Sequence, residues 1–180
     1  MTDVLALRYH DVCETPSDIN EHLPTFVALV EKLDAKNVVE LGTRSGVSTI
    51  AWLYALEGRG HLTSVDIDPR PDIGDYDHWT FIQGDDCTPD VFAQMPAAAD
   101  IVFIDTSHDY AQTCSELNLY HWLVRKGGII VLHDTELAHP EFVIGKPFPV
   151  KRAIDEFCRA EGFEWENHTN CFGLGIIKIR

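Results

Sequence analysis

Runs of apolar residues alternate along the chain with segments of helical periodicity. Continuous apolar runs predict five buried strands: Asn37–Leu41, His61–Val65, Trp79–Ile82, Ile101–Ile104 and Ile129–Leu132. Segments with one apolar face predict five helices: Asp18–Leu33, Val47–Leu56, Pro89–Met95, Asp109–Leu123 and Val150–Ala160. Two more strands, Phe163–Thr169 and Leu174–Ile179, predict a terminal hairpin. Because apolar strands alternate with helices, we expect an α/β, doubly wound and mostly parallel seven-stranded sheet, with an antiparallel C-terminal hairpin.

The length of 180 residues fits one domain that spans residues 1–180. Residues 1–36 are expected to supply an N-terminal cap segment and a helix, and no regular element is predicted before Ser17. The segment Glu136–Pro149 contains three prolines and is a candidate flap beside the sheet.

The stretch from Val38 to Thr49 joins the first strand to the first crossover helix through a glycine-bearing turn. Gly42 lets a ligand approach the main chain, and the free N–H groups at the helix start point into the same crevice. The spacing Glu-x-Gly-x-x-x-Gly-x-Ser has Arg44 where a dinucleotide fingerprint has its middle glycine, and it lacks the Gly-Lys-Ser/Thr of a phosphate-binding loop. An acid before the first glycine suits a cationic or hydroxyl-rich ligand. The turn is therefore a candidate small-molecule cradle, unless its glycines serve the turn alone.

Acids and histidines follow the ends of the predicted strands. Asp66 lies 24 residues after Gly42, where nucleotide-type crevices place an acid that binds ribose hydroxyls. An aspartate that shapes the turn before Pro69 is the alternative. Because the ends of parallel strands face one crevice, we expect these residues to gather at one edge of the sheet. They are Glu40, Asp66, Asp85, Asp105, His108, His133 and Asp134.

Charge and cysteine content narrow the class of protein. The net charge of −15 argues against a nucleic-acid partner and against docking on an anionic membrane. The N-terminus lacks the pattern of a secretory signal, and no run is apolar enough to span a membrane. The five cysteines are dispersed and form no Cys-x-x-Cys, so we expect reduced thiols in a cytoplasmic protein.

These segments resemble class I S-adenosylmethionine-dependent methyltransferases over about Asn37 to Arg180. Val-Val-Glu-Leu-Gly-Thr-Arg-Ser-Gly-Val-Ser-Thr is similar to their first motif, in the version of small metal-dependent O-methyltransferases. Thr-Ser-Val-Asp-Ile-Asp and Gln-Gly-Asp-Asp are similar to the second and third motifs. Ile-Val-Phe-Ile-Asp-Thr-Ser-His-Asp-Tyr and Lys-Gly-Gly-Ile-Ile-Val-Leu-His-Asp resemble the branch of antibiotic (macrolide) and sugar O-methyltransferases, relatives of proteins labelled cephalosporin hydroxylases. The resemblance implies a Rossmann-like fold with an antiparallel strand inserted last.

The resemblance also implies roles for residues of this sequence. Asp66 would bind the ribose of S-adenosylmethionine, and Asp85 or Asp86 would lie near its adenine. Asp105 and Asp134, with His133 beside them, would hold a divalent cation such as Mg²⁺. His108 would act as the base, with Asp105 as a second catalytic residue. The full set expected at the cofactor is Glu40, Gly42, Thr43, Ser45, Gly46, Ser48, Asp66, Ile67, Asp85, Asp86 and Asp105.

Several of these assignments have alternatives. Position 133 is often acidic in metal-using members and is histidine here, which leaves open a softer metal or none. Asp105 and Asp134 could be turn residues at strand ends, and His108 could cap the helix that starts near Asp109.

The expected chemistry is an in-line transfer of the sulfonium methyl group to a hydroxyl of a small molecule or sugar. A crevice edged with carboxylates favours the charged cofactor, and a bound cation would lower the pKa of the acceptor hydroxyl. A metal-independent methyltransferase on another acceptor, a non-catalytic cofactor-binding member and an NAD-dependent oxidoreductase are the alternatives. The acceptor pocket would come from the N-terminal segment, the loop after Asp105 and the flap, or from a second subunit of a homo-oligomer.

Packing or binding roles are also expected for several single residues outside the motifs. Trp52, Tyr54 and Trp122 are interpreted as packing residues, and His22 as a packing histidine of the N-terminal helix. Cys114 and Cys158 are interpreted as small core residues. Arg44 either holds the carboxylate of the cofactor or is exposed, and Tyr110 is a candidate lining residue of the acceptor pocket.

Overall fold

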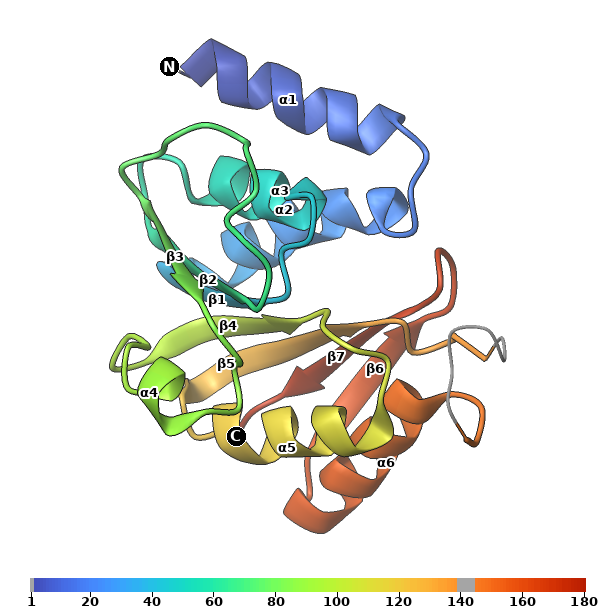
Figure 1. Cartoon of the computed structure of the whole chain (residues 1–180). Coiled ribbons are helices and arrows are strands. Elements are labelled where there is room, and N and C mark those ends of the chain that lie inside the picture. Colours follow the sequence, from blue (N-terminus) through green and yellow to red (C-terminus); the bar gives the residue numbers. More distant parts are fainter. Residues whose placement is uncertain (1, 139–144) are drawn as a thin grey trace.

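The structure is a computed structural model that describes residues 2–138 and 145–180. A seven-stranded sheet of order β3-β2-β1-β4-β5-β7-β6 forms its centre (Figure 1). The strands are β1 Asn37–Leu41, β2 His61–Asp66, β3 Trp79–Gln83, β4 Ala99–Ile104, β5 Val124–His133, β6 Glu164–His168 and β7 Leu174–Lys178. Strand β7 runs antiparallel to both of its neighbours, while β1 to β5 pair in parallel. The predicted α/β sheet with its antiparallel terminal hairpin is confirmed.

Helices cover both faces of this sheet (Figure 1). They are α1 Thr2–Glu14, a short 3₁₀ helix Asn20–His22, α2 Leu23–Leu33, α3 Val47–Leu56, α4 Pro89–Phe92, α5 Tyr110–Tyr120 and α6 Pro149–Glu161. Helices α1 to α3 form one apolar cluster with the sheet, and α4 to α6 form another on the opposite face. Within residues 2–138 and 145–180, none of the helices has the length and apolar composition of a membrane span.

Aromatic stacking anchors the face covered by α1 to α3. Trp52 is fully buried, stacks on Phe26 with ring centroids 4.3 Å apart, and also packs against Phe103. The packing role predicted for Trp52 is therefore confirmed. Trp122 is 81% exposed, so the same prediction for it is wrong. Helix α5 ends at Tyr120, and Trp122 falls in the turn that follows, with its ring against that of His121.

The N-terminal segment differs most from the prediction. Helix α1 is not expected from the sequence, because its helical pattern is weak; within residues 4–14, only Leu5 and Tyr9 anchor it as buried apolar residues. The helix expected over Asp18–Leu33 begins at Leu23 instead, with Pro24 in its first turn. Proline has no N–H to donate and fits that position, so the α-helix starts there and the preceding residues form the 3₁₀ turn.

Strand β5 is longer than the predicted Ile129–Leu132. It begins at Val124, because the main chain of residues 125–128 continues the sheet by exchanging hydrogen bonds with Ile179 through Gly127 and Gly128. The predicted flap falls partly on residues 139–144, which lie outside the described residues. At its end, Phe148 is the N-cap residue of α6 and Pro149 the first residue of that helix.

Candidate active site

The glycine turn after β1 lies directly against the end of β4. Gly42 has φ +88°, and a Cβ atom built on it would come within 2.0 Å of the carbonyl oxygen of Asp105. Gly46 has φ +85° and is the N-cap residue of α3. Both positions therefore require glycine, because a side chain would be strained at these angles and would clash at Gly42. The glycine turn, which is the predicted ligand cradle, therefore lies against Asp105, the predicted catalytic aspartate.

Asp66, at the end of β2, organises this turn. Its Oδ2 atom accepts hydrogen bonds from the backbone N–H groups of Thr43 and Arg44, at 2.7 Å and 2.9 Å, and from the Thr43 hydroxyl. Its Oδ1 atom accepts one, from the N–H of Asp68. Partial burial raises the pKa of Asp66, but these donors outweigh it and lower the pKa below its usual range. Oδ1 thus keeps acceptor capacity for a ligand hydroxyl.

Glu40 does not face the crevice, contrary to the expectation that it contacts the cofactor. It is 0% exposed, and its carboxylate accepts hydrogen bonds from the hydroxyls of Ser48, Thr49 and Ser64. Burial raises the pKa of Glu40 to about 7 although the hydroxyl donors lower it. Ser48 is likewise buried and turned to Glu40. These two residues join β1, β2 and α3 beneath the turn, so their expected cofactor contact is corrected to a structural role.

The remaining turn residues differ in their surroundings. Thr43 is buried against Asp66, and Ser45 is exposed. Arg44 has φ +46° and an exposed side chain, whose guanidinium pairs with Asp18 at 3.0 Å. The Arg44 side chain is thus exposed and paired with Asp18.

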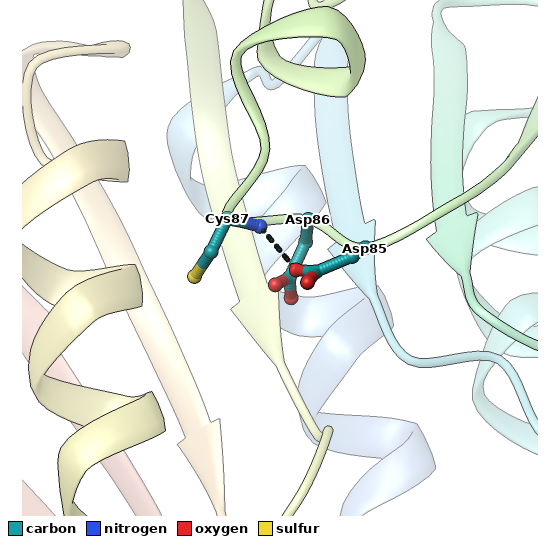
Figure 2. A group of neighbouring side chains, drawn as sticks. All are labelled: Asp85, Asp86 and Cys87. Atoms are coloured by element: carbon teal, nitrogen blue, oxygen red, sulfur yellow. Dashed lines mark hydrogen bonds between the residues drawn. The ribbon is translucent and has the colours of Figure 1, made fainter.

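The loop after β3 carries two predicted cofactor residues, Asp85 and Asp86, and their side chains have different surroundings (Figure 2). Asp85 is exposed, and its Oδ1 atom accepts a hydrogen bond from the N–H of Cys87. Asp86 is 6% exposed, and its carboxylate accepts a hydrogen bond from the Gln112 side chain on α5. The Asp86 side chain is therefore turned into the protein. Ile67, after β2, is 71% exposed and available to a ligand.

His133, at the end of β5, has both ring nitrogens engaged. Nε2 lies 3.0 Å from the carbonyl oxygen of Cys171, and Nδ1 lies 3.1 Å from Oδ2 of Asp134. Both oxygens only accept hydrogen bonds, so both nitrogens carry hydrogens. Burial lowers the pKa of His133, but Asp105 and Asp134 raise it to about 11. Both ring nitrogens thus face protein oxygens, and the group of possible metal ligands that the structure brings together contains His108 with Asp105 and Asp134, not His133.

His108, in the loop after β4, contacts Asp134, which follows β5. His108 Nε2 lies 2.8 Å from Asp134 Oδ2. The N-cap of α5 is supplied by Asp109, whose carboxylate accepts hydrogen bonds from two N–H groups of the first turn. His108 is therefore not needed as a helix cap. Asp134 is held in the left-handed region at φ +63°, and burial raises its pKa less than the two histidines lower it, so it stays a carboxylate.

Side-chain donor atoms of Asp105, His108 and Asp134 lie within 4.8 Å of one another. They line a cavity of about 10 Å³, which is space for one water molecule or one ion. Thr106, Thr113 and Val150 complete part of its wall. Two carboxylates and one imidazole are donors that suit a divalent cation, so the residues present fit a metal ion.

Residues at the rim of the site come from segments that are distant in the sequence and that no motif links to the strand ends. Cys171, at the tip of the terminal hairpin, binds His133 through its carbonyl. His22 is buried, as predicted, and its Nε2 lies 3.0 Å from the carbonyl oxygen of Asn170 on the same hairpin. Tyr110 is not part of the cavity wall. Its hydroxyl binds Glu156 and Arg152 covers its ring, so it joins α5 to α6 instead of lining an acceptor pocket.

Comparisons with known proteins agree with this geometry. A family model described as a methyltransferase domain matches residues 39–135, which is more than half of the chain. The chain therefore belongs to this methyltransferase-domain family. No curated protein matches the sequence.

Solved structures show the same fold at low identity. A Staphylococcus aureus protein assigned as a caffeoyl-CoA O-methyltransferase is 16% identical with a TM-score of 0.73, over 99% of this chain and 92% of that one. An O-methyltransferase from Bacillus cereus, in complex with S-adenosylhomocysteine (SAH), is 15% identical with a TM-score of 0.66, over 99% and 89%. The MycE methyltransferase of the mycinamycin pathway, in complex with Mg and SAH, is 19% identical with a TM-score of 0.70. The match covers 99% of this chain and 55% of MycE. The fold is that of class I S-adenosylmethionine-dependent methyltransferases.

Proposed function

We propose that this protein transfers the methyl group of S-adenosylmethionine to a hydroxyl group of a small molecule. The observation that carries the proposal is the contact between the glycine turn at Gly42 and the end of β4 at Asp105, which places a cofactor cradle beside the Asp105–His108–Asp134 centre. SAH in the Bacillus cereus structure and in MycE supports the same cofactor here.

We assign the cofactor's parts to residues that the structure leaves accessible. The main chain of the turn from Gly42 to Gly46 would surround the methionine portion, and Oδ1 of Asp66 would accept a ribose hydroxyl. Ile67 and Asp85, both exposed, would flank the adenine. The carboxylates of Asp105 and Asp134 favour the positively charged sulfonium over its neutral product.

The acceptor hydroxyl needs a base, and His108 is the residue we propose. Because Asp134 only accepts hydrogen bonds, His108 carries its hydrogen on Nε2, and Nδ1 of the neutral ring holds the free lone pair. When bound, S-adenosylmethionine would supply the methyl group and leave as neutral SAH, and Nδ1 of His108 would accept the proton that the acceptor hydroxyl loses. Asp134 orients the ring and stabilises the imidazolium that results.

A divalent cation fits this centre. Asp105 and Asp134 would hold it, and when bound it would orient the acceptor hydroxyl and lower its pKa. The Mg ion in the MycE complex supports this part of the proposal.

A metal-independent version is a second candidate, favoured by one specific observation. His133 already places a positive charge between Asp105 and Asp134, with its Nδ1 3.1 Å from Asp134 and 3.6 Å from Asp105. That charge could hold the two carboxylates in place without a metal, and His108 would remain the base.

The broader setting of the reaction is also a proposal. We propose that residues 1–180 act as one domain, possess an acceptor pocket formed by the N-terminal segment and the loop after Asp105, and assemble as a homo-oligomer that completes it. The described cysteines are all free, which supports a reducing compartment such as the cytoplasm.

Chelation separates the two candidates. We expect methyl transfer from radiolabelled S-adenosylmethionine to a panel of sugars and phenols to fall at least about tenfold in EDTA and to return with added Mg²⁺ or Mn²⁺. SAH binding should be unchanged in EDTA, which serves as the control for folding. Full turnover in EDTA would select the metal-independent candidate, and no transfer to any hydroxyl acceptor would contradict hydroxyl methylation.

A further inference from the structure

Glu116, in the middle of α5, is a buried acid that the proposed reaction does not use. It is 0% exposed, and its Oε1 atom accepts hydrogen bonds from the Thr106 hydroxyl at 2.5 Å and from the Gln112 side chain at 3.0 Å. Its Oε2 atom is buried and has no hydrogen-bond partner within residues 2–138 and 145–180. A buried carboxylate oxygen without a donor is costly, so this oxygen requires an explanation.

The explanation lies in a second buried acid beside it. The Nε2 atom of Gln112 donates both to Oε1 of Glu116 and to Oδ1 of Asp86, at 3.0 Å and 2.9 Å, so one amide group joins the two carboxyls. Two carboxylates this close in the interior cannot both be charged at low cost. Burial and the charge of Asp86 raise the pKa of Glu116 to about 8. A proton on Glu116 removes the charge from the unpartnered Oε2 atom and lets Glu116 share a hydrogen bond with the Asp86 carboxyl.

The other titratable groups around the pair add no positive charge. Asp85 and Cys87 flank Asp86 in the same loop, and Tyr120 reaches it from α5 with its hydroxyl donating to the Asp86 carbonyl at 2.9 Å. Burial, followed by the charges of Asp86 and Glu116, raises the pKa of the Cys87 thiol to about 12, so it stays neutral. One carboxylate oxygen each of Asp85 and Asp86 and the sulfur atom of Cys87 lie within 4.8 Å of one another (Figure 2). The proton of Glu116 therefore keeps the buried pair at a single negative charge, that of Asp86.

We propose that Glu116 is a positioning residue for cofactor binding: in its protonated form it holds Asp86 and thereby fixes the loop that presents Asp85 to the adenine. The inference rests on the proposed cofactor site. Glu116 also binds Thr106, which follows Asp105, so one side chain connects the adenine end of the cofactor site to the catalytic end. Loss of the proton leaves two buried negative charges that repel, and the loop moves away from the position that the adenine needs.

The test is the affinity for SAH as a function of pH, measured by calorimetry in EDTA. With a pKa of about 8, roughly one molecule in ten keeps the proton at pH 9, so Kd of the wild-type protein should rise about tenfold between pH 7 and pH 9. Glu116→Gln carries a permanent N–H donor, so its Kd should match the wild type at pH 7 and stay nearly constant to pH 9. Glu161→Gln, on the exposed end of α6, is the matched control and should follow the wild type.

Asp86→Asn provides a second variant in case Glu116→Gln does not fold, because it removes the other charge of the pair and should flatten the profile equally. A wild-type Kd that stays constant to pH 9, or a variant profile that follows the wild type, would overturn the inference while leaving the proposed function in place. Absence of SAH binding by the wild type at pH 7 would overturn the proposed function and the inference with it.

Discussion

Replacing Asp134 with asparagine is expected to lower kcat for methyl transfer by about 10²–10⁴-fold, the range that general acid–base catalysis supplies. Asparagine has nearly the same shape and tolerates the left-handed conformation that Asp134 adopts at φ +63°. The variant therefore loses the charge and keeps the fold. Without that charge, His108 is no longer oriented by a carboxylate 2.8 Å away, and the cation loses one of its two acidic donors.

The measurement compares kcat with the affinity for SAH in the same variant. We expect the affinity for SAH to stay within about threefold of the wild type, because SAH lacks the positive charge that the Asp134 carboxylate favours. Asp109→Asn is the matched control: the change is the same, the residue lies beside His108, and asparagine is an equally good helix N-cap. An Asp134→Asn enzyme that keeps more than a tenth of wild-type kcat would remove Asp134 from the mechanism.

Replacing Gly42 with alanine is expected to cost about 3 kcal/mol or more of folding free energy and to abolish SAH binding. Two effects combine at this position. The added Cβ would lie 2.0 Å from the carbonyl oxygen and 2.7 Å from the carbonyl carbon of Asp105, which are backbone atoms that no side-chain rotation can move away. The residue would also have to remain at φ +88°, which alone costs about 1–2 kcal/mol for a residue with a side chain.

Gly58→Ala isolates the cost of a positive φ angle from the cost of a backbone clash. Gly58 has φ +68°, and a Cβ atom there would meet nothing within 4 Å. We expect a loss of about 1 kcal/mol for this variant and unchanged SAH affinity. Urea unfolding followed by circular dichroism gives both free energies. If the two variants are equally stable, the contact between the glycine turn and Asp105 is not as close as the structure describes.

The sequence predicted the sheet, the glycine turn and the edge where the acids meet, because apolar runs and glycine spacing report directly on buried strands and tight turns. It did not predict which way each polar side chain points. Glu40 follows Val38 by two residues and so lies on the same face of β1, beneath α3, while Val39 and Leu41 pack on the other face. Attention to that alternation would have removed Glu40 from the cofactor set.

The same alternation explains His133. It follows Ile129 and Val131 on the face of β5 that packs against α1 to α3, so its ring meets His22 at a centroid distance of 5.8 Å. The Cys171 carbonyl that binds its other side comes from a hairpin tip 38 residues away, which no local pattern connects to it. Glu116 was missed for a related reason, since its partner Asp86 lies on a separate loop and a lone acid within a helical pattern normally faces solvent.

Calorimetry of the wild-type protein with SAH, S-adenosylmethionine and oxidised nicotinamide dinucleotide at neutral pH tests which cofactor the glycine turn binds. We expect dissociation constants in about the micromolar range for the two adenosyl ligands and no measurable heat with the dinucleotide. Binding of the dinucleotide alone, or of none of the three, would contradict the assignment of the glycine turn and Asp66 to S-adenosylmethionine.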